Sequence, residues 1–213
     1  MNRVRVWDVP TRLIHWLIVL LVAASWWTGD TGRMDWHRYS GYLLLGLISF
    51  RIYWGLVGAS TARFRQFVRG PQVVLSYLRG RWETLPGHNP LGALSTLVLL
   101  ALLAAQVVLG LFAVDVDGIE SGPLSNHVSF ATGRACAKLH HQLFDVLLVL
   151  IAAHVAAVLF YVVVKKQNLI AAMFTGKREY AQDLQPVVNA SKLRLISGAI
   201  IVAALTWFIT RGG

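Results

Sequence analysis

The stretch Lys138–Lys166, KLHHQLFDVLLVLIAAHVAAVLFYVVVKK, decides the fold because it is apolar enough to cross a membrane and yet carries three histidines. A spanning helix needs about 20 mostly apolar residues, and this stretch supplies them between its flanking lysines. Ionisable side chains at membrane depth are costly, and they usually face the interior of a helix bundle. The stretch therefore predicts a membrane helix with a functional interior face.

Four further apolar runs of similar length occur along the 213 residues. Hydrophobic residues make up 56% of the chain and charged residues only 14%, whereas a soluble domain carries about 25% charge. Too little chain remains between the runs for a separate soluble domain. We therefore predict an all-α integral membrane protein whose five spans cover residues 13–29, 39–58, 91–114, 143–164 and 193–209.

The basic residues are distributed unevenly between the predicted loops. With the N-terminus on the cytoplasmic side, most of the twenty Lys and Arg residues fall in inner segments, which is the positive-inside pattern. The net charge of +10 therefore sets the topology and does not indicate nucleic-acid binding. The basic inner loop over residues 59–90 also contains aromatic and aliphatic residues, a composition typical of a segment on an anionic lipid surface.

Helical geometry separates the two adjacent histidines of the opening stretch. An α-helix turns by about 100° and rises by about 1.5 Å per residue. His154 follows His140 by fourteen residues, so the two are about 40° apart around the axis and about 21 Å apart along it. His141 is about 140° away from His154. We therefore expect His140 and His154 to share one helix face, and His141 to point elsewhere.

Two histidines of other spans match these depths. His37 opens the second span at the level of His140, and His15 lies near the inner end of the first span, at the level of His154. The sequence thus predicts two stacked pairs inside a helix bundle. Each pair could supply both axial nitrogens of one haem iron, because bundle cores hold cofactors in this way. The alternative is four hydrogen-bonded structural histidines.

Four other residues could support such a site. Arg51 follows His37 by fourteen residues, so it lies on the same face about 21 Å further inward. It could pair there with a haem propionate, or it could be a snorkelling anchor at the membrane surface. Gly41, Gly46 and Gly110 leave room for a flat porphyrin, although glycines also allow close helix packing.

Three further residues have side chains that could bind metals or react, but they are expected to have no role in such a site. His88, in the turn-rich sequence PGHNP, and His127, in the second outer loop, are expected to be solvated. The alternative for His127 is docking or proton exchange near an outer site. The single cysteine, Cys136, forms no internal disulfide and no CxxCH attachment site for a c-type haem.

Three segments, in this order, resemble the bacterial cytochrome b561 family, and in particular its nickel–iron hydrogenase-type cytochrome b subunits. They are VRVWDVPTRLIHW, WHRYSGYLLLGLISFRIYWGLVG and LHHQLFDVLLVLIAAHVAAVLFYVVVKKQNLIAAMFTGKR. The resemblance implies a four-helix transmembrane bundle that binds two b haems, with axial ligands His15, His37, His140 and His154. It implies a dihaem domain over residues 1–180. The C-terminal extension over 181–213, with the fifth predicted transmembrane helix, lies outside the resemblance.

The resemblance also implies a function in the respiratory chain of the bacterial inner membrane. Electrons would pass between a periplasmic partner, which is a c-type cytochrome, dehydrogenase or hydrogenase, and the membrane quinone pool. The short first outer loop favours a c-type cytochrome or another small donor. The fifth helix is a candidate contact for a partner or for a second copy in a homo-oligomer.

Two other functions remain open. A self-contained, quinone-linked superoxide oxidase would need a positively charged outer mouth, and the acidic residues of the outer loops argue against one. A metal or proton transporter with histidine relay sites would usually carry intramembrane acids as well. The sequence shows no acid–base or nucleophilic catalytic group of residues, so whether the chain is itself an enzyme stays open.

Overall fold

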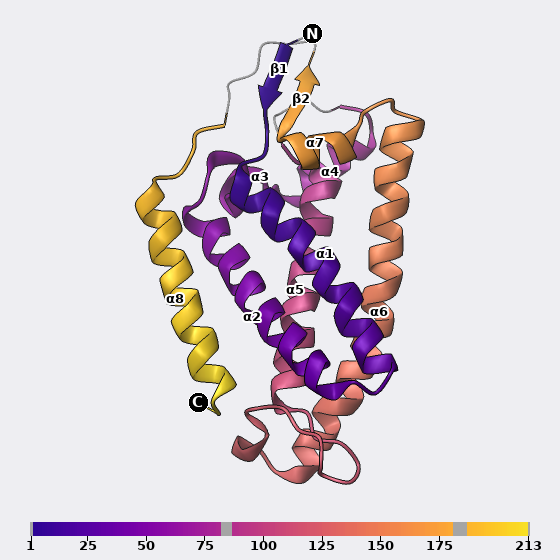
Figure 1. Ribbon diagram of the computed structural model, residues 1–213. Helices are drawn as coiled ribbons and strands as arrows, with labels where there is room; N and C mark the ends of the chain where they lie inside the picture. Colours follow the sequence, from indigo (N-terminus) through magenta and orange to yellow (C-terminus); the bar gives the residue numbers. More distant parts are fainter. Residues whose placement is uncertain (1, 82–86, 181–186, 213) are drawn as a thin grey trace. The chain divides into compact units, whose positions relative to one another are not determined.

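The computed structural model describes residues 2–81, 87–180 and 187–212 (Figure 1). In chain order the elements are β1 (Asn2–Arg5), α1 (Val9–Asp30), α2 (Met34–Val57), η1 (Ser60–Ala62), α3 (Phe64–Phe67), α4 (Pro71–Leu78), α5 (Pro90–Phe112), η2 (Ser125–His127), α6 (Phe130–Val163), α7 (Leu169–Thr175), β2 (Lys177–Tyr180) and α8 (Lys192–Thr210). Within the described residues, five helices are long and apolar enough to cross a membrane, namely α1, α2, α5, α6 and α8. The predicted all-α membrane fold with five spans is confirmed.

Helix α6 is longer than the apolar run that predicted it. It begins at Phe130, thirteen residues before the expected start at residue 143. Ser129 explains the early start, because its Oγ accepts a hydrogen bond from the backbone N–H of Thr132 at 3.2 Å and so caps the helix. His140 and His154 consequently lie on one unbroken helix, as the geometric argument requires.

The chain divides into two compact units, and each is described by itself. The first unit consists of Met1–Ile14, Arg51–Val98 and Ala152–Ile196. The second unit consists of His15–Phe50, Leu99–Ile151 and Ser197–Gly213.

A small antiparallel sheet in the first unit joins the N-terminal residues to the segment that follows α7. Strand β1 pairs with β2 so that Val4 lies opposite Arg178, and the strands are drawn side by side in Figure 1. The backbone N–H groups of Val6 and Trp7 both donate to the carbonyl of Gly176, at 2.8 and 3.2 Å. Gly176 ends α7 with a φ of 77°, a left-handed conformation that glycine adopts without steric cost.

The start of α1 is fixed to α2 by one buried carboxylate. Asp8 precedes the helix, and its Oδ1 accepts a hydrogen bond from the backbone N–H of Thr11 at 3.2 Å. Its Oδ2 accepts a second hydrogen bond from Nε1 of Trp54 at 2.7 Å. A buried carboxylate is tolerated only when its oxygens are engaged, and here it is both a helix cap and a link between helices.

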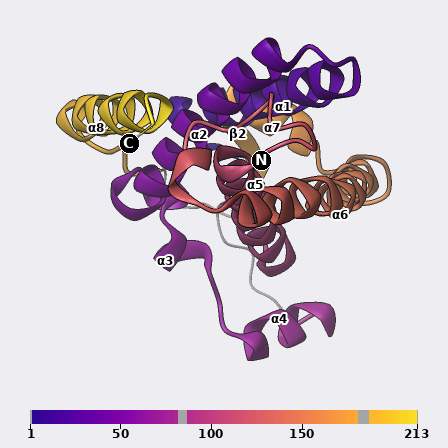
Figure 2. The same ribbon diagram turned by 90° about the horizontal axis from the view of Figure 1, so that it is seen from below.

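The basic segment between α2 and α5 contains the short helices α3 and α4, and Figure 2 shows the extended residues that join them. The hydroxyl group of Tyr77 in α4 shares a hydrogen bond with that of Tyr161 in α6. Asn89 donates a further hydrogen bond to the Tyr161 hydroxyl at 2.9 Å. Leu75 and Leu78 are exposed on α4, which suits the predicted position on a membrane surface.

In the second unit, α8 packs against α2 through small residues. Gly198 and Val202 are the buried residues of α8. A Cβ atom added to Gly46 of α2 would lie 3.4 Å from Oγ1 of Thr206. Gly46 therefore serves close packing against the fifth helix, which is one of the two roles expected for it.

Candidate functional site

His37 lies in the first turn of α2, and α1 holds its ring. The Nδ1 atom of His37 donates a hydrogen bond to the backbone carbonyl of Ser25 at 2.8 Å. A Cβ atom added to Gly29 would lie only 3.0 Å from the same Nδ1. Helix α1 thus fixes both the orientation and the protonated nitrogen of His37.

His140 of α6 is held by α5 in the same manner. Its Nδ1 donates a hydrogen bond to the backbone carbonyl of Gln106 at 2.9 Å. A Cβ atom added to Gly110, one turn further along α5, would lie 3.2 Å from Cε1 of His140. The predicted need for a small residue at position 110 therefore has a local reason, which is the close approach of the His140 ring to α5.

The structure brings His37 and His140 together. Their ring centroids are 6.0 Å apart and their planes are inclined by 81°. In a neutral imidazole whose Nδ1 carries the proton, Nε2 has a bare lone pair. Both histidines therefore offer Nε2 as a ligand, and donation of the other ring N–H to a carbonyl is the usual arrangement of metal-bound histidine.

The spacing of the two rings fits one ion between them. A metal–imidazole bond is about 2 Å long, so two rings on opposite sides of an ion have centroids about 6 Å apart. Within residues 2–81, 87–180 and 187–212, however, no group of three or more His, Cys, Asp or Glu side chains is gathered for a metal ion. Protein-only zinc sites use three or four such ligands, which is more than this pair of histidines supplies.

His141 differs from His140 in its surroundings. It is exposed, whereas His140 is half-buried, and the two ring centroids are 6.2 Å apart. The structure therefore gives the adjacent histidines different environments, in the sense that helix geometry predicts.

The remaining two candidate histidines belong to different units. His154 is half-buried in the first unit, where its Nδ1 lies 3.4 Å from Oγ of Ser95 on α5. His15 is half-buried in the second unit and forms an edge-to-face contact with Trp16 at 5.0 Å. Their pairing stays a prediction.

Arg51 lies in the first unit and is only 7% exposed. Its Nη1 donates a long hydrogen bond of 3.4 Å to the carbonyl of Ala62. Its guanidinium carbon lies 5.2 Å from the centre of the Phe64 ring. This burial differs from that of a snorkelling anchor, whose charged end reaches water.

The expectation that His88 is solvated is wrong. Its ring packs at 4.6 Å from Trp7 and at 4.4 Å from Phe67. Its Nε2 lies 3.1 Å from Oγ1 of Thr96. Burial, together with the positive charge of Arg51, lowers the pKa of His88 from its ordinary value of 6.5 to about 3.

A helix cap explains the position of His88. Asn89 accepts a hydrogen bond from the backbone N–H of Gly92 at 2.7 Å, and Pro90 is the first residue of α5. The letters HNPLG therefore mark a helix start, in which the residue before the cap folds back onto the helix. The other loop histidine, His127, is exposed, and its Nε2 lies 2.6 Å from the backbone carbonyl of Gly212.

The supporting groups of the His37–His140 pair carry no signal in the sequence. Ser25 and Gln106 contribute backbone carbonyls, which every residue possesses. A pattern of side chains cannot reveal them, whereas the fold of α1 and α5 around the two rings does.

Comparison with known proteins gives consistent results. A model of the family described as prokaryotic cytochrome b561 matches residues 6–176. A probable Ni/Fe-hydrogenase B-type cytochrome subunit from Azotobacter chroococcum mcd 1 is 26% identical, over 84% of this chain and 90% of the relative. Proteins of the same name from Azotobacter vinelandii and Cupriavidus necator are 25% and 24% identical, over 84% and 82% of this chain and 90% and 86% of their own lengths. No solved structure matches the chain.

Proposed function

Because this chain belongs to the prokaryotic cytochrome b561 family, we propose that it carries electrons through two bis-histidine b haems, between a redox partner on the outer side and the membrane quinone pool. It is a multi-pass membrane protein and a b-type cytochrome that transfers electrons. The observation that carries the proposal is the pair His37 and His140. Each ring keeps Nε2 available while Nδ1 is held by a backbone carbonyl.

In the proposed outer site, His37 and His140 would hold one haem through their Nε2 atoms. The haem supplies one-electron chemistry, and the protein supplies binding, orientation and electrostatics. Carbonyl groups of α1 and α5 hold both rings, so little rearrangement accompanies a change of charge at the site. Filling both axial positions with histidine favours electron transfer over reaction with oxygen.

In the proposed inner site, His15 and His154 bind the second haem, and Ser95 lies beside the Nδ1 atom of His154. Arg51 is the candidate partner of a haem propionate. A negatively charged partner strongly stabilises a buried guanidinium, because burying a charge without a partner costs several kcal/mol. Its burial and its long hydrogen bond to Ala62 support this assignment.

The proposed orientation places the N-terminus and the α2–α5 and α6–α8 connections on the cytoplasmic side, and the α1–α2 and α5–α6 loops on the periplasmic side. The basic residues of the first unit, which include those of the α2–α5 segment, support this orientation through the positive-inside rule. The N-terminal strand is then cytoplasmic. The segments proposed to be periplasmic contain five of the ten acidic residues of the chain, namely Asp30, Asp35, Asp115, Asp117 and Glu120.

Two classes of outer partner are compatible with this arrangement. The relatives are named as hydrogenase subunits, which favours a hydrogenase. Only three residues separate α1 from α2, and this short loop favours a small donor such as a c-type cytochrome. A superoxide oxidase is less well supported, since Arg38 near the outer site is already paired with Asp35 and Glu120.

The test is a redox titration of the purified protein. We expect two low-spin haem b groups per chain, which reduce in two steps. His37→Ala and His140→Ala should each remove the same haem, whereas His154→Ala should remove the other. A chain without a low-spin haem spectrum after dithionite reduction would refute the proposal, and so would loss of both haems from every histidine variant, including the exposed His127→Ala control.

A further inference from the structure

The loop after α5 forms a short hairpin over Val114–Ser121, which we call the acidic hairpin. Its ends are joined by an antiparallel bridge between Val114 and Ser121. The backbone N–H of Asp115 donates to the carbonyl of Glu120 at 3.0 Å. Gly118 turns the tip with a φ of 72°, a conformation that favours glycine. The hairpin is therefore an ordered structure with a defined tip.

Two aliphatic side chains project from this hairpin. Val116 is 72% exposed and Ile119 is 78% exposed, the highest value for a large hydrophobic residue within the described part of the chain. Both lie in a connecting loop outside the spanning helices. Asp115 and Asp117 flank Val116, and carboxylates at these positions disfavour insertion into a lipid layer. These two exposed aliphatic side chains are therefore available for contact with another protein.

The acidic hairpin is fastened next to both histidines of the outer pair. Glu120 forms a salt bridge with Arg38, the residue after His37. A Cβ atom added to Gly122, directly after the hairpin, would lie 2.2 Å from the carbonyl oxygen of Gly110, and Gly110 packs against His140. A protein bound to the hairpin would therefore lie close to the proposed outer haem.

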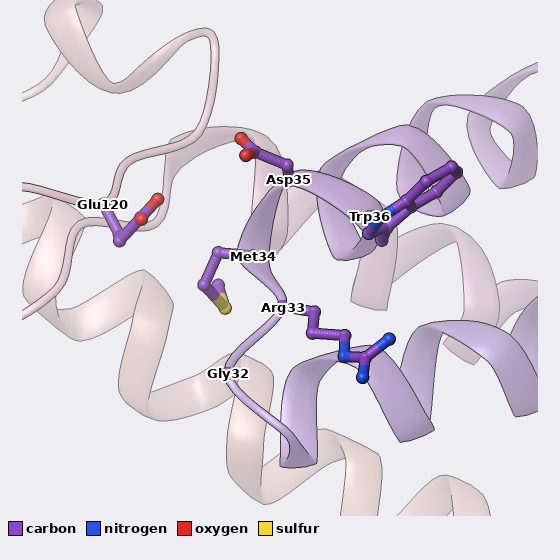
Figure 3. Close-up of a pocket in the computed structure, with 6 residues that line it drawn as sticks. All are labelled: Gly32, Arg33, Met34, Asp35, Trp36 and Glu120. Carbon is purple, nitrogen blue, oxygen red and sulfur yellow. The ribbon is translucent and has the colours of Figure 1, made fainter.

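A recess of ≈ 400 Å³ adjoins the hairpin and shares Glu120 with it (Figure 3). Its other side is lined by residues 32–36, which are the end of the α1–α2 turn and the first residues of α2. In Figure 3 the carboxylates of Asp35 and Glu120 lie on facing sides of the recess, whereas Arg33 points away from them. Trp36, at the rim, is largely exposed. A projecting apolar tip thus stands beside a recess with an aromatic rim.

The charge of this surface is negative. Residues 30–38 and 114–121 together contain five carboxylates and two guanidinium groups. Arg38 is occupied by Asp35 at 2.5 Å and by Glu120, and Arg33 lies over the ring of Trp27 at 4.8 Å. The exposed carboxylates of Asp30 and Asp117 therefore make the local electrostatic potential negative. A negative potential attracts basic proteins.

We propose that the acidic hairpin and the adjoining recess form the docking surface for the soluble electron-transfer partner, a protein with an apolar patch inside a basic rim. This proposal rests on the proposed function, because it needs an outer haem at His37 and His140. Val116 and Ile119 supply the desolvated centre of the contact, and the carboxylates supply steering and register.

The test measures one electron leaving the reduced b haem and converting ferric cytochrome c, a basic soluble protein, to the ferrous form. The haem-loaded protein in nanodiscs is reduced with dithionite, desalted and mixed with cytochrome c in a stopped-flow instrument. We expect the second-order rate constant to fall at least about tenfold between low and physiological salt. Asp117→Lys should lower the low-salt rate about tenfold and flatten the salt dependence. In succinylated cytochrome c the lysine amino groups carry carboxylates instead of positive charges. This protein should react slowly with the wild type and with the variant, at every salt concentration.

The apolar centre is tested at constant salt. The double variant Val116→Ser/Ile119→Ser should raise the dissociation constant about tenfold without changing the haem spectrum. The matched control is Val188→Ser, because Val188 is also an exposed aliphatic residue but lies in the first unit. Equal rates for the double variant and the control, with both haems present, would overturn the docking proposal and leave the proposed function intact. Absence of haem in the wild-type chain would instead refute the function.

A second readout separates protein docking from lipid contact. The single cysteine, Cys136, is replaced by serine, and Ile119→Cys is labelled with an environment-sensitive fluorophore. We expect emission typical of water in nanodiscs alone and a blue shift when cytochrome c is added. A blue shift on reconstitution into lipid without cytochrome c would show that the hairpin contacts the membrane, and it would contradict the proposal.

Discussion

His37 and His140 face each other across the second unit, with ring centroids 6.0 Å apart, and each is held through Nδ1 by the backbone of a different neighbouring helix. Four helices therefore contribute to one site, two with imidazoles and two with carbonyl groups. Because the carbonyls select the tautomer, both Nε2 atoms are ready to act as ligands.

The first prediction concerns the adjacent histidines of α6. His140→Ala should remove the outer haem, because the exposed His141 lies on another face of the helix and cannot replace it. His141→Ala should keep both haems. The ratio of haem to protein, measured as the pyridine haemochrome, checks this expectation. Haem loss in the His141 variant alone would refute the assignment from helix geometry.

A second prediction concerns the contact between Gly110 and His140. Gly110→Ala places a Cβ atom 3.2 Å from the imidazole, so the ring must shift and its hydrogen bond to Gln106 must lengthen. Loss of such a supporting contact should weaken haem binding by about tenfold or more. Haem transfer to apomyoglobin measures this change.

Gly70→Ala is the matched control for that experiment. No atom within the described chain lies within 4 Å of a Cβ at this position, and its φ is −65°. The control should bind haem as tightly as the wild type. If Gly110→Ala behaves like the control, the close approach of α5 is not what positions His140.

The third prediction follows from the burial of His88. Its pKa is lowered to about 3 in the folded chain from an ordinary value of 6.5, so between these pH values the unfolded chain binds a proton that the folded chain does not. The free energy of unfolding therefore has its highest value, with respect to His88, above pH 6.5, and it falls as the pH decreases towards 3. At pH 5 the loss attributable to His88 is about 2 kcal/mol.

His88→Phe should remove this pH dependence, because phenylalanine fits the aromatic contacts and does not titrate. Thermal unfolding in detergent at pH 7.5 and pH 5.0 measures the effect. The variant should gain about 2 kcal/mol relative to the wild type at the lower pH. An unchanged difference between the two proteins at the two pH values would mean that His88 is solvated after all.

The fourth prediction concerns Gly176, which joins α7 to β2. Gly176→Ala imposes a left-handed conformation on alanine, which costs about 1–2 kcal/mol. It also brings a Cβ atom to 2.7 Å from the carbonyl oxygen of Trp7. The backbone must then move away from the N-terminal strand, so the total loss of stability should reach about 2–4 kcal/mol.

Gly80→Ala measures the cost of the left-handed conformation alone. Gly80 has a nearly equal φ of 74°, and no described atom lies within 4 Å of an added Cβ. Its loss of stability should therefore be limited to the conformational cost. Equal melting temperatures for the two variants would show that the approach to Trp7 contributes nothing.

The sequence was sufficient to predict the five spans, because apolar length is a one-dimensional property. It also separated His140 from His141, since a regular helix converts spacing into direction. The expectation for His88 is wrong because the sequence PGH is typical of a turn. The following residues Asn89 and Pro90 are in fact a cap and a first helical residue, which place His88 against the helix.

Other features depend on contacts between segments that are distant in the chain. The sheet between β1 and β2 comes from two strands of four residues each, too short and too polar to produce a pattern. The carbonyl groups of Ser25 and Gln106 leave no trace in the sequence. Gly46 was compatible with two roles, and only the position of Thr206 on α8 shows that it serves helix packing.

The pairing of β1 with β2 also has a consequence for biosynthesis. Arg3 and Glu179, which face each other in the sheet, are 176 positions apart, so the first strand leaves the ribosome long before its partner exists. At about 5–20 residues per second it waits roughly 10–35 s. The sheet can close only after α6 has been made, and its closure therefore marks a chain whose helices α1, α2, α5 and α6 have all been synthesised.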